Sequence, residues 1–259
     1  KRAESYYVDN TYGLPIHTFE VDSCVFKGRD TASILFISGN VYQAVCKVDR
    51  CFFEMSGTLS FTDADTMIIN RCTFVNSPYL SLFKLGIVTS LYTIFKNSYI
   101  KRGRNELINT RKIKIFNSIL ESPSLERCIS NLETMHNSLV IARSLNTSTE
   151  PISIKNSILI DTDGGGFVGP FTPTSIDHSF VRISCAASGI VCNNGSNLIG
   201  IDPLFRDAAN GDYTLLPCSP LINAGDNSAA AGLPTDLAGN PRIQGGRVDI
   251  GPYEMPVFA

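Results

Sequence analysis

The chain has 259 residues, enough for a substantial core, and its charge is nearly balanced, with 22 lysines and arginines against 24 aspartates and glutamates. This balance gives no electrostatic case for a nucleic-acid partner, and no apolar run approaches the roughly 18 to 20 residues that span a bilayer. The chain starts at Lys1 without a methionine or an apolar signal segment, so we expect a processed or trimmed product.

The N-terminal part is expected to close one end of a repeat fold. Residues 12–19 are predicted to cover the first rung, because an exposed strand edge would pair with another chain. Strand-like copies then begin at Cys24, Cys51 and Cys72, each of which opens an apolar triplet. The pattern indicates either a column of buried thiols or disulfides, and the even number of cysteines suits an oxidising compartment.

A short motif then returns about every 20 residues, as expected of a coiled repeat fold. Each copy has an asparagine followed by a serine, with apolar residues two positions before and mostly two after it. The asparagines are Asn76, Asn97, Asn117, Asn137 and Asn156, and a weaker copy has His178 in the asparagine place. If the coils stack at a strand spacing of about 4.8 Å, these amides form a ladder that satisfies its own polar groups.

These observations predict an all-β fold, a single-stranded right-handed parallel β-helix with coils of about 20 residues. Two columns of apolar side chains are expected to point inward. The first contains Phe74, Phe95, Ile115, Met135, Ile154 and Ile176, and the second contains Tyr99, Ile119, Leu139, Ile158 and Phe180. A leucine-rich repeat is disfavoured because β-branched and aromatic residues outnumber leucine here, and only one residue separates the last apolar strand position from asparagine.

Candidate catalytic residues follow the last strong repeat. The acidic cluster Asp161-Thr162-Asp163-Gly164 resembles the NTD-type motif of polygalacturonases, and a carboxylate pair is what hydrolysis of a glycosidic bond requires. The partner motifs of that family, Gly-His-Gly and Arg-Ile-Lys, do not appear later in the chain. Asp161 and Asp163 are therefore the candidate catalytic pair of an incomplete site.

A basic segment and a cysteine pair complete the candidate sites. The candidate binding residues are Lys101, Arg102, Arg104, Arg111 and Lys112, with a solvated charged face as the ordinary alternative. Cys185 and Cys192 bracket a glycine-containing loop, so a local disulfide is predicted. Metal-type CxxC spacing is absent, and no cofactor is expected, with calcium as the alternative in lyase chemistry.

The last part of the chain differs from the repeats. Prolines recur through residues 201–259, so this region is predicted to be an irregular cap lying across the last rung of a solenoid formed by residues 1–200. Its aspartates, namely Asp202, Asp226, Asp236 and Asp249, are interpreted as acceptors for nearby backbone N–H groups rather than as calcium ligands.

An ordered series of motifs runs through this region: DPLF at 202–205, GDYTL at 211–215, SPLINAG at 219–225, DLAGNPR at 236–242 and VDIGPYE at 248–254. The series resembles the terminal region of secreted bacterial right-handed β-helix proteins, the choice-of-anchor or pectate-lyase-like group. The resemblance implies export and surface attachment more than a particular chemistry.

Two hypotheses about function follow from the resemblance. The first is a non-catalytic module of a larger surface protein, for adhesion, scaffolding or glycan contact, with a surface glycan or another cell-surface protein as its partner. The second is a polysaccharide lyase or glycoside hydrolase of the same fold. The motifs place either protein outside the cell or on the bacterial surface.

Overall fold

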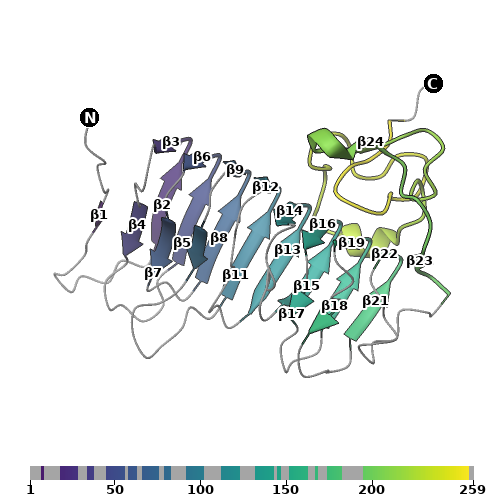
Figure 1. Cartoon of the computed structure of the whole chain (residues 1–259), viewed down its shortest axis with the longest axis horizontal. Helices are drawn as coiled ribbons and strands as arrows, with labels where there is room; N and C mark the ends of the chain where they lie inside the picture. Colours follow the sequence, from purple (N-terminus) through teal and green to yellow (C-terminus); the bar gives the residue numbers. More distant parts are fainter. Residues whose placement is uncertain are drawn as a thin grey trace.

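The computed structural model (Figure 1) is a parallel β-solenoid with almost no helix, which confirms the predicted all-β repeat fold. It describes residues 7–8, 18–28, 34–37, 45–55, 58–62, 66–75, 79–82, 92–101, 112–122, 132–142, 145–146, 152–162, 167–168, 174–182 and 195–256. The sheet pairings within the solenoid are parallel, and successive coils in the Asn-Ser region are offset by 19 to 22 residues.

Two long sheets run the length of the solenoid. Sheet B contains β2 (Thr18–Asp22), β5 (Val45–Asp49), β8 (Thr66–Asn70), β11 (Tyr92–Lys96), β13 (Ile113–Phe116), β15 (Leu132–His136), β18 (Ile152–Lys155) and β21 (Thr174–Asp177). Sheet C contains β3 (Val25–Gly28), β6 (Phe52–Met55), β9 (Thr73–Val75), β12 (Tyr99–Lys101), β14 (Ile119–Ser122), β16 (Leu139–Ala142), β19 (Ile158–Asp161), β22 (Phe180–Arg182) and β23 (Leu198–Ile199).

Shorter sheets form further sides. Sheet A contains β1 (Tyr7–Val8), β4 (Ile34–Ile37), β7 (Thr58–Thr62) and β10 (Tyr79–Leu82), and β17 (Leu145–Asn146) pairs with β20 (Phe167–Val168). Of the segment expected to cover the first rung, residues 18–19 belong to β2, and residues 12–17 lie outside the described part of the chain.

A two-residue corner joins each sheet B strand to the sheet C strand that follows it. Its first residue, the corner position, has a left-handed backbone with φ between 46° and 54°. The corner residues are Ser23, Arg50, Arg71, Asn97, Asn117, Asn137, Asn156 and His178. Asparagine adopts this conformation at lower cost than most residues, which explains the recurrence of Asn in the repeat.

The register places Arg71, not Asn76, in line with Asn97, because Thr73 pairs with Tyr99. The coil between these corners is longer than its neighbours, with Cys72 and Ser98 separated by 26 residues. The alignment of Asn76 with the ladder was therefore wrong, since the motif around Asn76 follows β9 rather than β8. Asn76 itself lies outside the described residues.

The second corner residue points into the solenoid and is cysteine in the first rungs and serine in the later ones. Each serine hydroxyl donates to the carbonyl two residues earlier, as Ser118 does to Phe116 O at 2.7 Å. The backbone N–H of each serine donates to the serine Oγ of the next rung, as between Ser118 and Ser138 at 3.2 Å, except at Ser179, whose N–H donates to Asn197 Oδ1 at 2.9 Å. In the first rungs a thiol replaces the hydroxyl, and Cys72 Sγ donates to Asn70 O at 3.2 Å. The cysteines that the structure describes are free thiols, whereas Cys185 and Cys192 lie outside the described ranges.

The interior core includes a continuous apolar column from each long sheet. The sheet B column contains Val48, Ile69, Phe95, Ile115, Met135, Ile154 and Ile176, and the sheet C column contains Phe53, Phe74, Ile100, Leu120, Val140, Leu159 and Val181. Phe74 therefore belongs to the sheet C column rather than the one predicted for it, and its ring stacks on Phe53 with centroids 4.8 Å apart.

The second predicted column is real but faces outward. Ile119, Leu139, Ile158 and Phe180 form a separate core with Tyr213, Leu215, Leu221 and Ile250. These partners belong to residues 200–256, which we call the C-terminal lobe. In Figure 1 the lobe, in green and yellow, lies over the outer side of sheet C. It thus covers the flank of the solenoid along several rungs, rather than lying across the last rung as predicted.

The lobe is irregular apart from the antiparallel pair β24 (Phe205–Asp207) and β25 (Asp212–Leu215) and the short 3-10 helices η2 (Ala208–Asn210) and η3 (Asn227–Ala230). Its close approach requires glycine at position 251, where φ is 117° and an added Cβ would lie 2.6 Å from Cδ1 of Ile158. The predicted role of its aspartates is confirmed. Each accepts a backbone N–H at 2.7 to 2.9 Å: Asp202 from Leu204, Asp226 from Ser228, Asp236 from Asn240 and Asp249 from Asn223.

Candidate functional site

The asparagine corners form the seam between the solenoid and the lobe. Asn117, Asn137 and Asn156 are completely buried, and each side-chain amide donates to a lobe carbonyl. The acceptors are Thr235 O at 3.1 Å, Ala229 O at 2.9 Å and Asp226 O at 2.8 Å, respectively. Each of these asparagines therefore shapes the corner and also binds the lobe.

The same amides form a partial ladder along the solenoid. Nδ2 of Asn117 donates to Oδ1 of Asn97 at 2.7 Å, and Nδ2 of Asn156 donates to Oδ1 of Asn137 at 3.0 Å. The ladder is interrupted between Asn117 and Asn137, where Oδ1 of Asn117 has no hydrogen-bond partner within the described part of the chain. Beyond Asn97 the ladder continues to Asn70, the residue that precedes the corner residue Arg71. Nδ2 of Asn97 donates to Oδ1 of Asn70 at 3.0 Å.

The corner carries charged pairs where the lobe does not cover it. Arg50 forms a two-pronged pair with Asp22, and Arg71 forms the same pair with Asp49, one rung earlier in each case. The Arg50 guanidinium lowers the pKa of Asp22 to about 2. Arg71 is the last of these charged corners before the asparagines begin.

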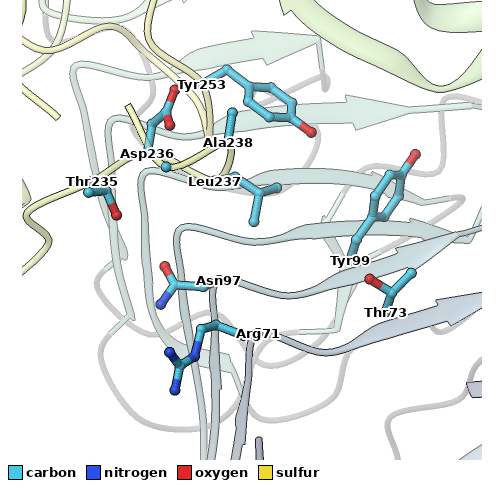
Figure 2. Close-up of a pocket in the computed structure, with 10 residues that line it drawn as sticks. Arg71, Thr73, Asn97, Tyr99, Thr235, Asp236, Leu237, Ala238 and Tyr253 are labelled. Carbon is cyan, nitrogen blue, oxygen red and sulfur yellow. The ribbon is translucent and has the colours of Figure 1, made fainter. Parts of the chain in front are cut away.

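A cleft of about 460 Å³ lies where the edge of the lobe meets the corner of Arg71 (Figure 2). The solenoid contributes Arg71, Thr73, Asn97 and Tyr99, and the lobe contributes Tyr253 and residues 235–239. Figure 2 shows Tyr99 and Tyr253 on one side of the view, Arg71 and Asn97 on the other, and Leu237 between them.

The two tyrosines offer neutral hydroxyls and ring surface. Burial raises the pKa of Tyr99 well above its ordinary value and that of Tyr253 to about 12, so both phenols stay protonated at physiological pH. The Tyr99 hydroxyl lies 3.3 Å from both Gly211 O and Glu121 Oε2, which fixes its ring at the edge of the lobe. The guanidinium of Arg71 is about half exposed and carries the positive charge of the cleft.

The acidic residue among those lining the cleft is Asp236, which is buried. Its carboxylate accepts the backbone N–H of Asn240 at 2.7 Å and that of Glu254 at 2.9 Å. Asp236 therefore holds the lobe together and does not present a free carboxylate to a ligand. The cleft supplies hydrogen-bond donors, one cation and aromatic surface.

Asp161 of the predicted catalytic pair is not among the described residues that line this cleft. It ends β19 with 6% of its surface exposed, and it pairs in register with Ala142, a member of the interior core. Its carboxylate is therefore on the inner side of sheet C, where a polymer cannot reach it, which does not fit the catalytic role predicted for it. Asp163 lies outside the described residues.

The basic segment is described at its two ends. Lys101 ends β12 in sheet C and lies beside Gly211 of the lobe, whereas Lys112 directly precedes β13 in sheet B and pairs with Glu133 at 3.8 Å. Arg102, Arg104 and Arg111 lie outside the described residues. The two described lysines thus belong to different sheets and have different partners.

Other sites are weaker. A hollow of about 280 Å³ beside sheet B has charged lining residues that are already in ion pairs: Lys47 with Glu20 at 2.6 Å, Asp22 with Arg50 and Asp49 with Arg71. Within the described ranges, histidine, cysteine, aspartate and glutamate side chains do not gather into a group of three that could hold a metal ion. The helices of the described part of the chain are too short to cross a membrane.

Sequence reasoning missed the cleft because its walls are far apart in the chain. Tyr253 was visible only as part of the VDIGPYE motif, and Arg71 did not fit the Asn-Ser repeat. Comparison with known proteins gives no match to a family model, a curated protein or a solved structure. The function is therefore argued from the geometry of the cleft.

Proposed function

We propose that the chain is an exported cell-surface β-helix module, part of a larger surface protein, that contacts a surface glycan through the cleft between the C-terminal lobe and the solenoid. The observation that carries this proposal is the cleft lining, in which Tyr99 and Tyr253 lie across from Arg71, whose half-exposed guanidinium is paired with Asp49 (Figure 2). Aromatic ring faces beside a few placed donors suit a pyranose ring, which has apolar faces and a hydroxylated edge.

The proposal is of binding rather than cleavage. Glycoside hydrolysis needs a pair of carboxyl groups on either side of the scissile bond. Asp236 is the acid among the cleft-lining residues, and its oxygens already accept backbone N–H groups. The surface location is supported by the resemblance of the C-terminal motifs to those of secreted β-helix proteins. These motifs build the lobe that forms one wall of the cleft.

A cleft-filling substitution tests this function. Ala238 is exposed and lines the cleft, so Ala238→Trp would occupy the space without removing a hydrogen bond. The matched control is Ala231→Trp, at an exposed alanine of the same lobe that is not among the cleft-lining residues. The probes are labelled cello-, chito- and galacturonan hexamers, measured by fluorescence anisotropy.

We expect the parent chain and Ala231→Trp to bind at least one hexamer equally, and Ala238→Trp to lose that binding. Absence of binding to all three probes, or equal binding by Ala238→Trp, would contradict the proposal. Each incubation is also assayed for new reducing ends and unsaturated products, because their release would favour the lyase or hydrolase alternative.

A further inference from the structure

Four charged side chains are buried together inside the C-terminal lobe. Asp236, Arg242, Asp249 and Glu254 each expose 4% of their surface or less, and we call them the lobe ion cluster. Arg242 Nη1 lies 3.4 Å from Glu254 Oε1, and the guanidinium also donates to Pro252 O at 3.1 Å and Gly251 O at 2.6 Å. The cluster thus contains one cation and three carboxyl groups.

This composition cannot be fully ionised at low cost. Three carboxylates and one guanidinium would leave two uncompensated negative charges away from water, and a buried charge without a partner is strongly unfavourable. Like-charged carboxyl groups that share a site respond by retaining a proton on one of them. At least one carboxyl group of the cluster therefore carries a proton in the folded lobe.

The hydrogen bonds identify Glu254 as the group that retains the proton. Asp236 accepts from the backbone N–H and the side-chain amide of Asn240 and from the Glu254 N–H, and Asp249 accepts from the N–H groups of Asn223 and Met255. Among the described residues, Glu254 accepts a single N–H, that of Asp249, at 3.1 and 3.2 Å from its two oxygens. A carboxylate with fewer donors gains less from ionisation.

The electrostatic surroundings agree with this assignment. Burial raises the pKa of Glu254 to about 8, with the nearby Asp249 and Asp236 acting in the same direction and Arg242 and the Asp249 N–H opposing it. Burial also raises the pKa of Asp249 and lowers that of Arg242. Among the described residues, the charged groups that act on Glu254 are Asp236, Arg242 and Asp249.

The lobe ion cluster also holds the lobe wall of the cleft. The N–H of Glu254 donates to Asp236, and the N–H of Leu237 donates to Pro252 O at 2.9 Å, the same carbonyl that accepts from Arg242. Asp236, Leu237 and Tyr253 all line the cleft. Any loosening of the cluster would therefore move the residues that form this wall.

We propose that the protonation state of Glu254 controls the lobe wall of the cleft. The wall stays packed against the rest of the lobe while Glu254 carries a proton, and it loosens when Glu254 ionises. Ligand binding in the cleft therefore weakens above neutral pH. The effect on binding rests on the function proposed above. The proton linkage itself is a property of the lobe and is measured without a ligand.

The direct test is a carboxyl titration by NMR on the full chain labelled with ¹³C at the glutamate side chains. Glu254 is assigned by the signal lost in Glu254→Gln. We expect its midpoint near 8, well above the ordinary glutamate range near 4.3. A midpoint for Glu254 in that ordinary range would overturn the proposal. If the variant does not fold, assignment through the neighbouring backbone resonances of the parent chain keeps the test decisive.

The second test follows hydrogen exchange of amides 235–239 and 252–255 between pH 6 and 9, corrected for the intrinsic exchange rate. The amides of the parent should lose protection from exchange as the pH rises. Glu254→Gln mimics the protonated carboxyl group, so its amides should be equally protected at pH 6 and pH 9. Glu20→Gln is the control and should behave as the parent does. Unchanged protection of the parent across this range would refute the loosening of the wall.

The binding test uses the hexamer that the parent chain binds best. Its affinity should fall about tenfold at pH 9 for the parent, the factor by which the protonated fraction falls one unit above a midpoint of about 8, and stay constant for Glu254→Gln. A parent chain that binds equally at both pH values would refute the link to the cleft. If the chain binds none of the hexamers, the glycan proposal is refuted but the proton linkage is not, because the titration and exchange experiments test the linkage without a ligand.

Discussion

The corner between sheets B and C has one backbone conformation, but its residue type differs between the uncovered rungs and the rungs under the lobe. In the first rungs, at Arg50 and Arg71, it carries exposed cations paired with aspartates of the preceding rung. In the rungs covered by the lobe, at Asn117, Asn137 and Asn156, it carries buried amides. The left-handed φ is the same throughout, so the environment of the side chain distinguishes the two regions.

Desolvation explains the difference. A guanidinium under the lobe would lose its water and would need a buried carboxylate partner, which rarely compensates for the cost. A neutral amide is easier to bury, and its two N–H groups and one oxygen can satisfy both the ladder and the lobe carbonyls. The comparison teaches that the covered stretch of a solenoid can be located from the change of residue type at a fixed corner position.

The largest expected effect is at Asn156. Asn156→Leu removes bonds to Asp226 O, Asp226 N–H and Asn137 Oδ1. The Asp226 N–H and Asn137 Oδ1 lose the partner that Asn156 gave them, whereas Asp226 O still accepts the N–H of Ala229. It also places a leucine in the left-handed region. We expect the free energy of unfolding to fall by about 3 to 5 kcal/mol, measured by urea denaturation.

Arg50→Leu is the matched substitution at an uncovered corner. The Arg50–Asp22 pair is exposed to solvent, and exposed ion pairs contribute little to stability, so its loss should be clearly smaller than that of Asn156→Leu. Equal losses at the two positions would mean that the left-handed corner alone, rather than lobe docking, determines the effect.

The two regions should also respond to pH with opposite signs. Glu254 has a folded pKa of about 8, above its unfolded value, so its contribution is present below about pH 4.5 and is lost as the pH rises through 8. We expect the free energy of unfolding of the parent to fall by a few kcal/mol between pH 5 and 9, and the fall to disappear in Glu254→Gln.

Asp22 supplies the opposite sign at the uncovered corner. Its folded pKa of about 2 lies below the unfolded value of 3.8, so its contribution is present above that value and is lost as the pH falls through 2. Replacing Asp22 by Asn should therefore remove the slope that this carboxyl group gives to the acid limb and lower the rest of the stability curve by a constant amount. A change in the slope of the alkaline limb of this variant would show that the two regions are not independent.

A smaller loss of stability is expected in the column of serines that point into the solenoid from the second corner position. Oγ of Ser157 accepts the N–H of Ser138 at 3.3 Å and donates to Lys155 O at 2.8 Å. Ser157→Ala leaves the buried N–H of Ser138 unpaired, whereas Lys155 O still accepts the N–H of Asn137 at 3.1 Å. The free energy of unfolding should fall by about 1 to 3 kcal/mol in urea denaturation. A variant as stable as its parent would indicate that water enters the column and replaces the hydroxyl.

The sequence was sufficient for the repeat, because the Asn-Ser period reflects one local conformation with one local hydrogen-bond pattern. The sequence was not sufficient where the direction of a side chain depends on contacts with distant parts of the chain. The outward direction of Ile119 and Leu139 could not be distinguished from an inward one, because the lobe buries the outer face of sheet C as fully as the coil buries the inner face.

The candidate site was harder still to predict. The two walls of the cleft come from Arg71 and Tyr99 in the solenoid and from Tyr253 in the lobe, which no local spacing relates. The acidic motif at Asp161 drew attention because of its composition, yet the strand alternation of β19 turns that side chain inward. Composition indicates a chemistry, but register decides whether solvent and ligand can reach it.

The smallest expected effect concerns the change from thiol to hydroxyl along the inward column. Cys72 is buried, and its thiol donates to Asn70 O as the serine hydroxyls do in later rungs, so Cys72→Ser keeps this bond while giving up buried sulfur surface. We expect a change within about 1 kcal/mol in urea denaturation. The reverse substitution, Ser138→Cys, should cost more, because a thiol accepts the Ser118 N–H only weakly. If both substitutions cost the same, packing volume rather than hydrogen bonding distinguishes the two halves of the column.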